Sequence, residues 1–184
     1  MKLIVALFIG VLNCFSMFNY AEQFNSEQDL LILQFDSKTD VDDLHTIAAS
    51  HSILHRLESM NINYLAVAGA YGIQDGLYVP SPELFISAFN DNWVDAHKHY
   101  DKAIDMVSKQ VIERILLGGK IWVMEAGQSD FTAQWLKIVS KNMSKTSLKS
   151  DINIIQHSRW NEEQTSVKAL EYTQEIASYY KIPD

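Results

Sequence analysis

Short apolar runs alternate along this chain with longer segments of helical periodicity. Four runs, at residues 30–35, 62–69, 120–125 and 152–156, have the length and composition of buried strands. Between them, apolar side chains recur every three or four positions, as they do on the buried face of a helix. Strands that alternate with helices predict an α/β domain, with a mostly parallel sheet that is flanked by helices and joined by right-handed crossovers.

Proline, glycine and short polar side chains indicate where the helices begin and end. Pro82 suits the first turn of a helix, Gly118 and Gly119 end a long one, and Ser129 or Asp130 suits an N-cap. With these boundaries, we expect helices at residues 44–57, 82–90, 93–117, 130–139 and 162–180, and a polar loop at residues 140–150. The link between the second and third strands is long for one crossover, which predicts an extra helix or a lid there.

The first 21 residues have the pattern of a secretory signal peptide. One lysine precedes an apolar run that is too short for a comfortable transmembrane helix. Small side chains suit cleavage after Ser16 or after Ala21. A buried first strand is the alternative interpretation. We expect an exported protein, secreted or periplasmic, whose mature domain spans residues 22–184.

Composition and charge narrow the class of protein. A chain of 184 residues fits one domain, and its apolar content of 47% is enough for a core. The net charge of −8 argues against non-specific binding to nucleic acid and against docking on an anionic membrane. Cys14 is the only cysteine, so the chain has no internal disulfide framework.

Four aspartates, Asp36, Asp40, Asp42 and Asp43, follow the first expected strand where it passes into a helix. In an open α/β sheet, ligands bind at this carboxyl edge. Four negative charges repel one another unless a positive group lies among them, and a hard divalent cation takes oxygen ligands. An acidic helix N-terminus is the alternative, although it accounts for only one or two of the aspartates. Lys38 offers a third interpretation, a metal-free network of lysine and aspartate.

Every expected strand is followed by a polar or glycine-rich cluster. The four clusters lie at residues 36–43, 69–76, 127–130 and 157–161. Because the carboxyl ends of parallel strands meet at one edge of a sheet, we expect these clusters to converge there. This convergence is a stronger indication of a functional site than any single motif.

The last cluster carries side chains that suit a sugar or a base. His157 and Asn161 have groups that hydrogen-bond sugar hydroxyls, and Trp160 offers a face for stacking. A helix cap, with Trp160 in the core, is an equally good interpretation of the same residues.

The aspartate cluster resembles the D-x-D-x-x-x-D-D signature of the nucleoside hydrolase superfamily, which includes the inosine-uridine preferring enzymes. Asp36, Asp42 and Asp43 match its first, third and fourth aspartates. Lys38 replaces the second, and Asp40 stands where glycine is usual. The spacing is closer to a divergent branch of exported proteins linked to carbohydrate use.

Two later segments also resemble this superfamily. Residues 65–70 are similar to its second-strand segment T-V-A-G-N, with Ala70 in place of the substrate-binding asparagine. Residues 125–130 lie where the family has G-P-L-T-N, and Asp130 matches the threonine that offers an oxygen to the metal. Family members are usually longer, and no counterpart of their late aspartate and histidine precedes Asp184. A fragment, a minimal relative and a relative without catalysis all remain open.

The resemblance implies a Rossmann-like fold and a calcium-dependent hydrolase of N-glycosidic bonds in nucleosides or related glycosides. It implies Asp42 as the general base or as a hydrogen-bond partner of the sugar, and calcium ligands among Asp36, Asp40, Asp43 and Asp130. In such a site the metal lowers the pKa of a bound water, a carboxylate takes its proton, and the water attacks an anomeric carbon with oxocarbenium character.

A second hypothesis is a relative that keeps the fold and binds carbohydrate or nucleoside without hydrolysis. Lys38, Ala70 and the short C-terminal part favour it. In both cases the expected partner is a small molecule rather than nucleic acid or membrane. Because related enzymes are often dimers or tetramers, the resemblance leaves open a homo-oligomer.

Overall fold

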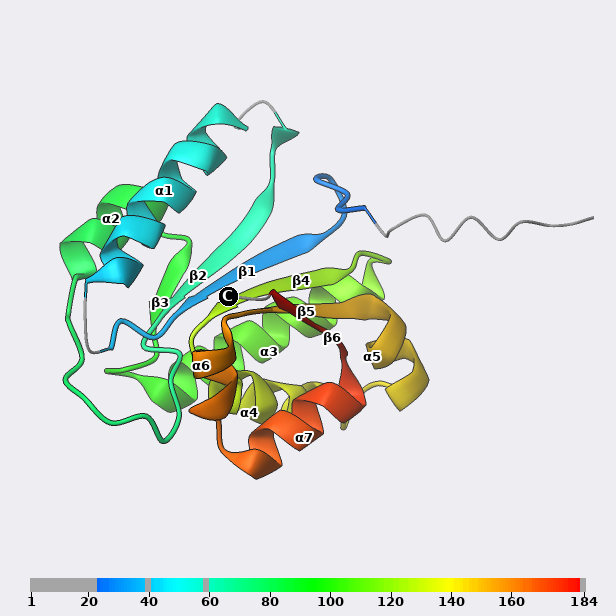
Figure 1. Ribbon diagram of the computed structural model, residues 1–184. Helices are drawn as coiled ribbons and strands as arrows, with labels where there is room; N and C mark the ends of the chain where they lie inside the picture. The colour runs from blue at the N-terminus through cyan, green and yellow to red at the C-terminus, as the bar shows by residue number, and fades with distance from the viewer. Residues whose placement is uncertain (1–22, 39–40, 58–59, 183–184) are drawn as a thin grey trace, which may run out of the picture.

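The computed structural model describes residues 23–38, 41–57 and 60–182 of the chain. They form a six-stranded, all-parallel sheet in the order β3-β2-β1-β4-β5-β6, with helices packed on both faces (Figure 1). The predicted α/β class, with a parallel, Rossmann-like sheet, is confirmed. The expected signal peptide lies outside the described residues. No helix in the described part of the chain is both long enough and apolar enough to cross a membrane.

The strands are β1 (Leu30–Phe35), β2 (Asn63–Ala68), β3 (Trp93–Asp95), β4 (Ile121–Ala126), β5 (Ile152–His157) and β6 (Ser178–Ile182). The helices are α1 (Asp42–Arg56), α2 (Pro82–Phe89), α3 (Tyr100–Leu116), α4 (Asp130–Val139), α5 (Lys145–Asp151), α6 (Arg159–Glu163) and α7 (Val167–Ile176). The four apolar runs of the sequence thus became β1, β2, β4 and β5.

Strand β1 lies at the centre of the sheet because nearly all of its side chains are apolar, on both faces. Ile32 pairs in parallel register with Leu65 of β2 and Val123 of β4. All three side chains are buried, as expected for a central parallel strand. The paired neighbours also satisfy the backbone hydrogen-bonding groups of β1 on both edges.

Two hydrophobic clusters attach the helices to the sheet. On one face, α1 and α2 pack over β1 and β2, where Phe35 contacts Phe85 edge-on and stacks on Phe89. On the other face, α3, α4 and α7 cover the sheet, and Trp135 lies fully buried among aliphatic side chains. Burial of each such side chain contributes about 1.5–3 kcal/mol to stability.

The face of β4 that lies on the α1 side of the sheet is only partly covered. Its burial alternates along the strand, so that Ile121, Val123 and Glu125 are buried while Met124 and Ala126 are half-buried. The buried residues face the α3–α4 layer. The half-buried ones form the floor of a pocket at the carboxyl edge of the sheet.

Two segments near the edges of the sheet differ from the predictions. Trp93–Asp95 forms β3 beside β2, and was predicted as the first turn of the long helix. The chain predicted as one helix over residues 162–180 is divided into α6, α7 and β6. Both edge strands exist because a neighbouring strand offers them hydrogen bonds, and periodicity along one segment does not show that neighbour.

Helix α5 occupies most of the segment predicted as a polar loop. Ser144 caps it, since its side chain accepts a hydrogen bond from the backbone N–H of Ser147. Leu148 is its buried residue and packs into the core. One buried leucine is too little for a helical period to be visible in the sequence.

Candidate functional site at the β1–β4 crevice

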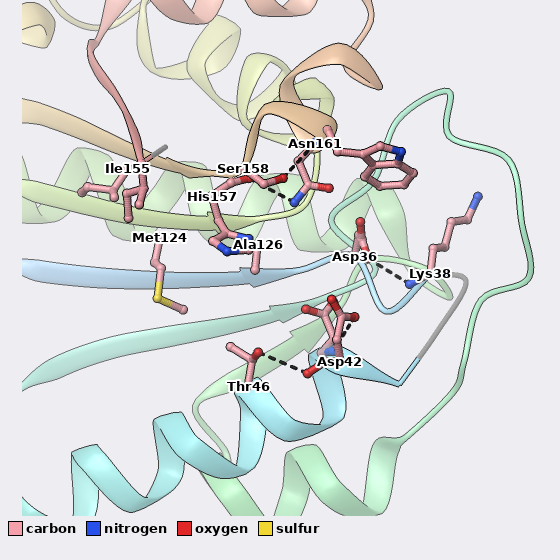
Figure 2. A pocket seen from close by; sticks show the side chains of 13 residues that line it. Asp36, Lys38, Asp42, Thr46, Met124, Ala126, Ile155, His157, Ser158 and Asn161 are labelled. Carbon is pink, nitrogen blue, oxygen red and sulfur yellow. Dashed lines mark hydrogen bonds between the residues drawn. The ribbon is translucent and has the colours of Figure 1, made fainter. Parts of the chain in front are cut away.

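The strand order reverses between β1 and β4, because the chain leaves β1 towards β2 on one side and returns to β4 on the other. Ligands of open α/β sheets bind at such a switch point, outside the carboxyl ends of the strands. A pocket of ≈ 420 Å³ lies there, and we call it the edge pocket (Figure 2). Its lining comes from β1, α1, β4, β5, α6 and β6: Asp36, Lys38, Asp42, Asp43, Thr46, Met124, Ala126, Ile155, His157, Ser158, Trp160, Asn161 and Ile182.

Asp36 and Asp43, the acid pair, lie side by side at the wall of the edge pocket. Asp36 follows β1 directly and Asp43 belongs to the first turn of α1; each is 5% exposed. Between them, Ser37 has a left-handed backbone with φ 52, and its N–H donates to Asp43 Oδ2 at 2.6 Å. The left-handed turn therefore brings two buried carboxyl groups together.

Asp43 carries a strongly perturbed carboxyl group. Its pKa is raised to about 8, chiefly by burial and also by the nearby carboxyl groups of Asp36 and Asp42, although the hydrogen bond from the Ser37 backbone lowers it. Two adjacent carboxyl groups avoid repulsion either by holding a proton or by binding a cation. The acid pair thus offers carboxylate oxygens, which are the ligands that a hard cation prefers.

Asp42 lies at the exposed end of the same cluster. Its Oδ1 accepts a hydrogen bond from the backbone N–H of Asp43 at 2.8 Å. Across the edge pocket from Asp36 and Asp42 lie His157, Ser158 and Asn161, which come from the end of β5 and the start of α6 (Figure 2). The structure therefore brings the first aspartates and the residues predicted at the substrate to one cavity.

Asn161 is buried, whereas Trp160 is 48% exposed. The Asn161 amide donates to the backbone oxygen of His157 at 3.2 Å, and Ser158 caps α6 by accepting from the Asn161 N–H. The cap is thus present at Ser158, and the cluster also lines the edge pocket, so its role at a substrate stays a prediction. Trp160 is not in the core, and its exposed ring lies where it can contact a ligand.

Gln128 links the two sides of the edge pocket, and the sequence analysis did not identify it. It is fully buried in the turn after β4, and its Nε2 donates to Asp36 Oδ2 at 2.9 Å and to Asn161 Oδ1 at 3.2 Å. Its Oε1 accepts from the backbone N–H of Gly72 at 3.4 Å. Only its position at the end of an expected strand, in the cluster at residues 127–130, pointed to it.

Lys38 lines the edge pocket, and its ammonium group is held by the loop after β2. The Nζ atom donates to the backbone oxygen of Gln74 at 2.7 Å and lies 3.9 Å from the centroid of the Tyr71 ring. The backbone N–H of Lys38, rather than its charge, binds Asp36, at 2.9 Å from Oδ1. These contacts direct the ammonium group towards the loop (Figure 2).

Asp130, a predicted calcium ligand, is engaged at the N-terminus of α7. Its Oδ2 accepts from the backbone N–H of Ser166 at 3.0 Å, and its Oδ1 accepts from the Ser166 hydroxyl. It does not line the edge pocket. Asp40, another predicted ligand, lies outside the described residues. The acid pair is therefore the part of the predicted calcium set that the structure brings together.

The described ranges contain no group of three or more histidine, cysteine, aspartate and glutamate side chains that could hold a metal ion. A cation at the acid pair would fit by donor chemistry, because both side chains offer carboxylate oxygens in a buried, crowded position. Searches of protein-family models, of curated proteins and of solved structures find no significant match to this chain.

Proposed function

We propose that the edge pocket binds a nucleoside or a related glycoside and hydrolyses its N-glycosidic bond. One observation carries the proposal: the acid pair and Asp42 share a pocket with His157, Trp160 and Asn161 at the switch point of the sheet. This arrangement sets carboxyl groups opposite side chains that suit sugar hydroxyls and a flat ring. A volume of ≈ 420 Å³ is in the range of small-molecule sites.

The half-buried floor of the edge pocket complements such a ligand. Met124, Ala126 and Ile155 supply apolar contacts for the carbon face of a sugar or for a base. His157 and Asn161 offer hydrogen bonds, and the exposed ring of Trp160 offers stacking, which is worth about 0.5–1.5 kcal/mol beyond burial for an aromatic pair. The site therefore combines apolar walls with a few polar groups, as ligand pockets usually do.

The chemistry follows from the carboxyl groups. Asp42 lies at the mouth, where solvent reaches it, and is suited to take a proton from an attacking water. Asp36 and Asp43 would hold the calcium ion, which when bound lowers the pKa of a water in its coordination shell. The buried position of the acid pair keeps these charges close to the ligand and away from bulk solvent.

Binding without hydrolysis is the second candidate, and the hydrogen bonds of Asp36 favour it. Its Oδ1 accepts from the Lys38 N–H and its Oδ2 from Gln128, so both oxygens already have partners. A carboxylate occupied in this way has less capacity for a cation. In this second function, the edge pocket binds the ligand through the same sugar-binding groups, and the protein is a lectin-like or nucleoside-binding protein.

Calorimetry with calcium chloride, followed by a base-release assay on a panel of nucleosides, tests the proposal. We expect calcium binding to the wild type and to Asp105→Asn, which changes an exposed aspartate of α3, and none to Asp43→Asn. Base release should need calcium and should fall at least about a hundredfold in Asp42→Asn. Nucleoside binding without base release would favour the second candidate, and an absence of both would contradict the proposed function.

A further inference from the structure

A row of polar side chains crosses the buried face of the sheet beneath the edge pocket. Gln34 of β1, Glu125 of β4 and Gln156 of β5 are register partners on adjacent strands, and none of them is exposed. The preceding row on the same face is apolar, with Ile32, Val123 and Ile154. Buried polar groups are costly without hydrogen bonds, so the partners of this row indicate its purpose.

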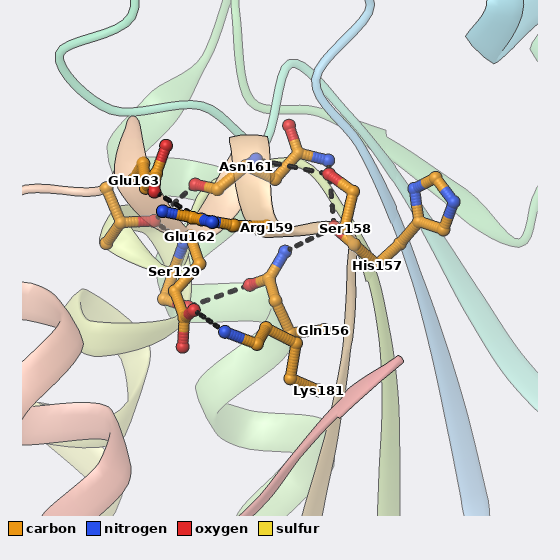
Figure 3. A network of polar contacts seen from close by, with 10 residues as sticks. Ser129, Gln156, His157, Ser158, Arg159, Asn161, Glu162, Glu163 and Lys181 are labelled. Atoms are coloured by element: carbon orange, nitrogen blue, oxygen red, sulfur yellow. Dashed lines mark hydrogen bonds and ion pairs between the residues drawn. The ribbon is translucent and has the colours of Figure 1, made fainter. Parts of the chain in front are cut away.

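Gln156 ties the ends of β4 and β5 together. Its Nε2 donates to the backbone oxygens of Gly127 at 2.9 Å and His157 at 3.1 Å. Because both of these partners are carbonyl oxygens, the nitrogen must face them and Oε1 must face the opposite way. There it meets the hydroxyl of Ser129 at 3.2 Å (Figure 3).

Ser129 has one hydroxyl proton between two acceptors. Its Oγ lies 2.7 Å from Glu125 Oε2 and 3.2 Å from Gln156 Oε1. If Glu125 is ionised, Ser129 donates to one acceptor and the other loses its donor. If Glu125 is protonated, its O–H donates to Ser129 Oγ, and Ser129 donates to Gln156. Both contacts of Ser129 Oγ are hydrogen bonds at the same time only with that extra proton.

The surroundings of Glu125 also disfavour its charge. The pKa of Glu125 is raised to about 7, chiefly by burial and also by Asp130 on α4, although the hydroxyls of Ser129 and Thr132 lower it. Tyr179 of β6 lies near Glu125, Ser129 and Glu162, although its buried hydroxyl makes no hydrogen bond of good geometry within the described part of the chain.

The other charged groups on this side of Glu125 already have partners. Glu162 of α6, which acts on Tyr179, is ion-paired with Lys181 of β6 (Figure 3). The Asp130 carboxylate is itself hydrogen-bonded to Ser166. The charges nearest to Glu125 are therefore negative or already paired.

We propose that Glu125, in its protonated form, is a positioning residue that joins Ser129 and Gln156 into a clamp on the turn at residues 127–129. This turn carries Gln128, whose amide holds Asp36 and Asn161 in the edge pocket. The Ser129 N–H is fixed at the same time by the Thr165 hydroxyl at 3.2 Å. The proposal does not depend on which ligand the edge pocket takes, so its test is independent of the proposed function.

NMR of the full chain with glutamate labelled at the carboxyl carbon tests the protonation. We expect one glutamate signal with a midpoint near pH 7, and the loss of that signal in Glu125→Gln. The control Glu113→Gln, which changes an exposed residue of α3, should keep it. Titration of every glutamate signal below about pH 5.5 would overturn the proposal.

Hydrogen exchange at the Ser129 amide tests the positioning role. Its protection factor in the wild type should fall at least about tenfold between about pH 6 and pH 8, as Glu125 loses its proton. Glu125→Gln, whose amide can donate to Ser129 as the protonated acid does, should keep high protection at both values. Ser129→Ala should show low protection at both. Protection that is independent of pH in the wild type, or that is lost in Glu125→Gln, would overturn the clamp.

Discussion

The side-chain amide of Gln128 donates a hydrogen bond of 2.9 Å to the carboxylate of Asp36, and this contact joins the turn after β4 to the end of β1. The same nitrogen donates to Asn161, so that three segments far apart in the sequence meet at one buried amide. The position of the acid pair relative to the sugar-binding side of the edge pocket therefore depends on a glutamine that has no titratable group of its own.

Replacement of Gln128 by leucine should destabilise the protein. The substitution leaves the acceptors on Asp36 and Asn161 without this donor while nearly preserving the volume of the side chain. An unsatisfied buried acceptor costs about 1–3 kcal/mol, and urea denaturation should show a loss of this size in the free energy of unfolding. Gln174→Leu, at an exposed position of α7, should lie within about 0.5 kcal/mol of the wild type. A Gln128→Leu protein as stable as this control would show that the bridge is dispensable.

Replacement of Ser37 by glycine should stabilise the protein. Ser37 has a φ of 52, which glycine adopts without steric cost, and its hydroxyl lacks a hydrogen bond among the described residues. We expect a gain of about 0.5–1 kcal/mol in the free energy of unfolding, measured by thermal and urea denaturation. Ser37→Ala removes the same hydroxyl without relieving the backbone and should give no gain. Equal effects of the two variants would mean that the left-handed turn carries no strain.

The stability of the wild type should fall as pH rises from about 4.5 to about 7, in part through Glu125. The unfolded chain releases the Glu125 proton near the ordinary pKa of 4.5, whereas burial raises the pKa in the folded protein to about 7. A carboxyl group whose pKa is raised in the folded state contributes stability that is fully present below pH 4.5 and is lost as the pH rises towards about 7. The shift corresponds to about 3 kcal/mol. Urea denaturation across this pH range should show that the free energy of unfolding of Glu125→Gln rises by this amount relative to that of the wild type. Free energies that change in parallel with pH in the two proteins would contradict the raised pKa of Glu125.

Replacement of Asp130 by alanine should weaken α7 and leave calcium binding unchanged. The carboxylate accepts two hydrogen bonds from Ser166 at the start of this helix, and loss of such a cap costs about 0.5–2 kcal/mol. Calorimetry should give the same calcium affinity for the variant and the wild type. A clear loss of affinity in a folded Asp130→Ala protein would restore the resemblance-based role of Asp130 as a calcium ligand.

The convergence of strand ends was predictable from the sequence, and the direction of each side chain was not. Asp36, Asp42, Asp43, His157, Trp160 and Asn161 all line the edge pocket, because parallel strands must end at one edge. Asp130 also follows a strand, yet its carboxylate faces Ser166, a residue that follows it by more than thirty positions. Such a contact depends on how α4 and α7 pack, which no local pattern contains.

Gln128 and β6 were missed for related reasons. A glutamine belongs to no catalytic or metal motif, so only the structure shows that it reaches both Asp36 and Asn161. Residues 178–182 follow a helical pattern directly, but pairing with β5 draws them into the sheet. In both cases the decisive partner is distant in sequence, so that tertiary contacts override the local pattern.

An NMR titration of uridine and inosine into the ¹⁵N-labelled full chain, with calcium chloride present, shows whether the edge pocket is the ligand site. We expect the indole signal of Trp160 and the side-chain amide signals of Asn161 and Gln128 to shift together and to saturate. Signals on the far helices, such as the backbone amide of Ile112 on α3, should stay in place. Shifts confined to residues away from the carboxyl edge of the sheet, or no shift with either nucleoside, would contradict this expectation.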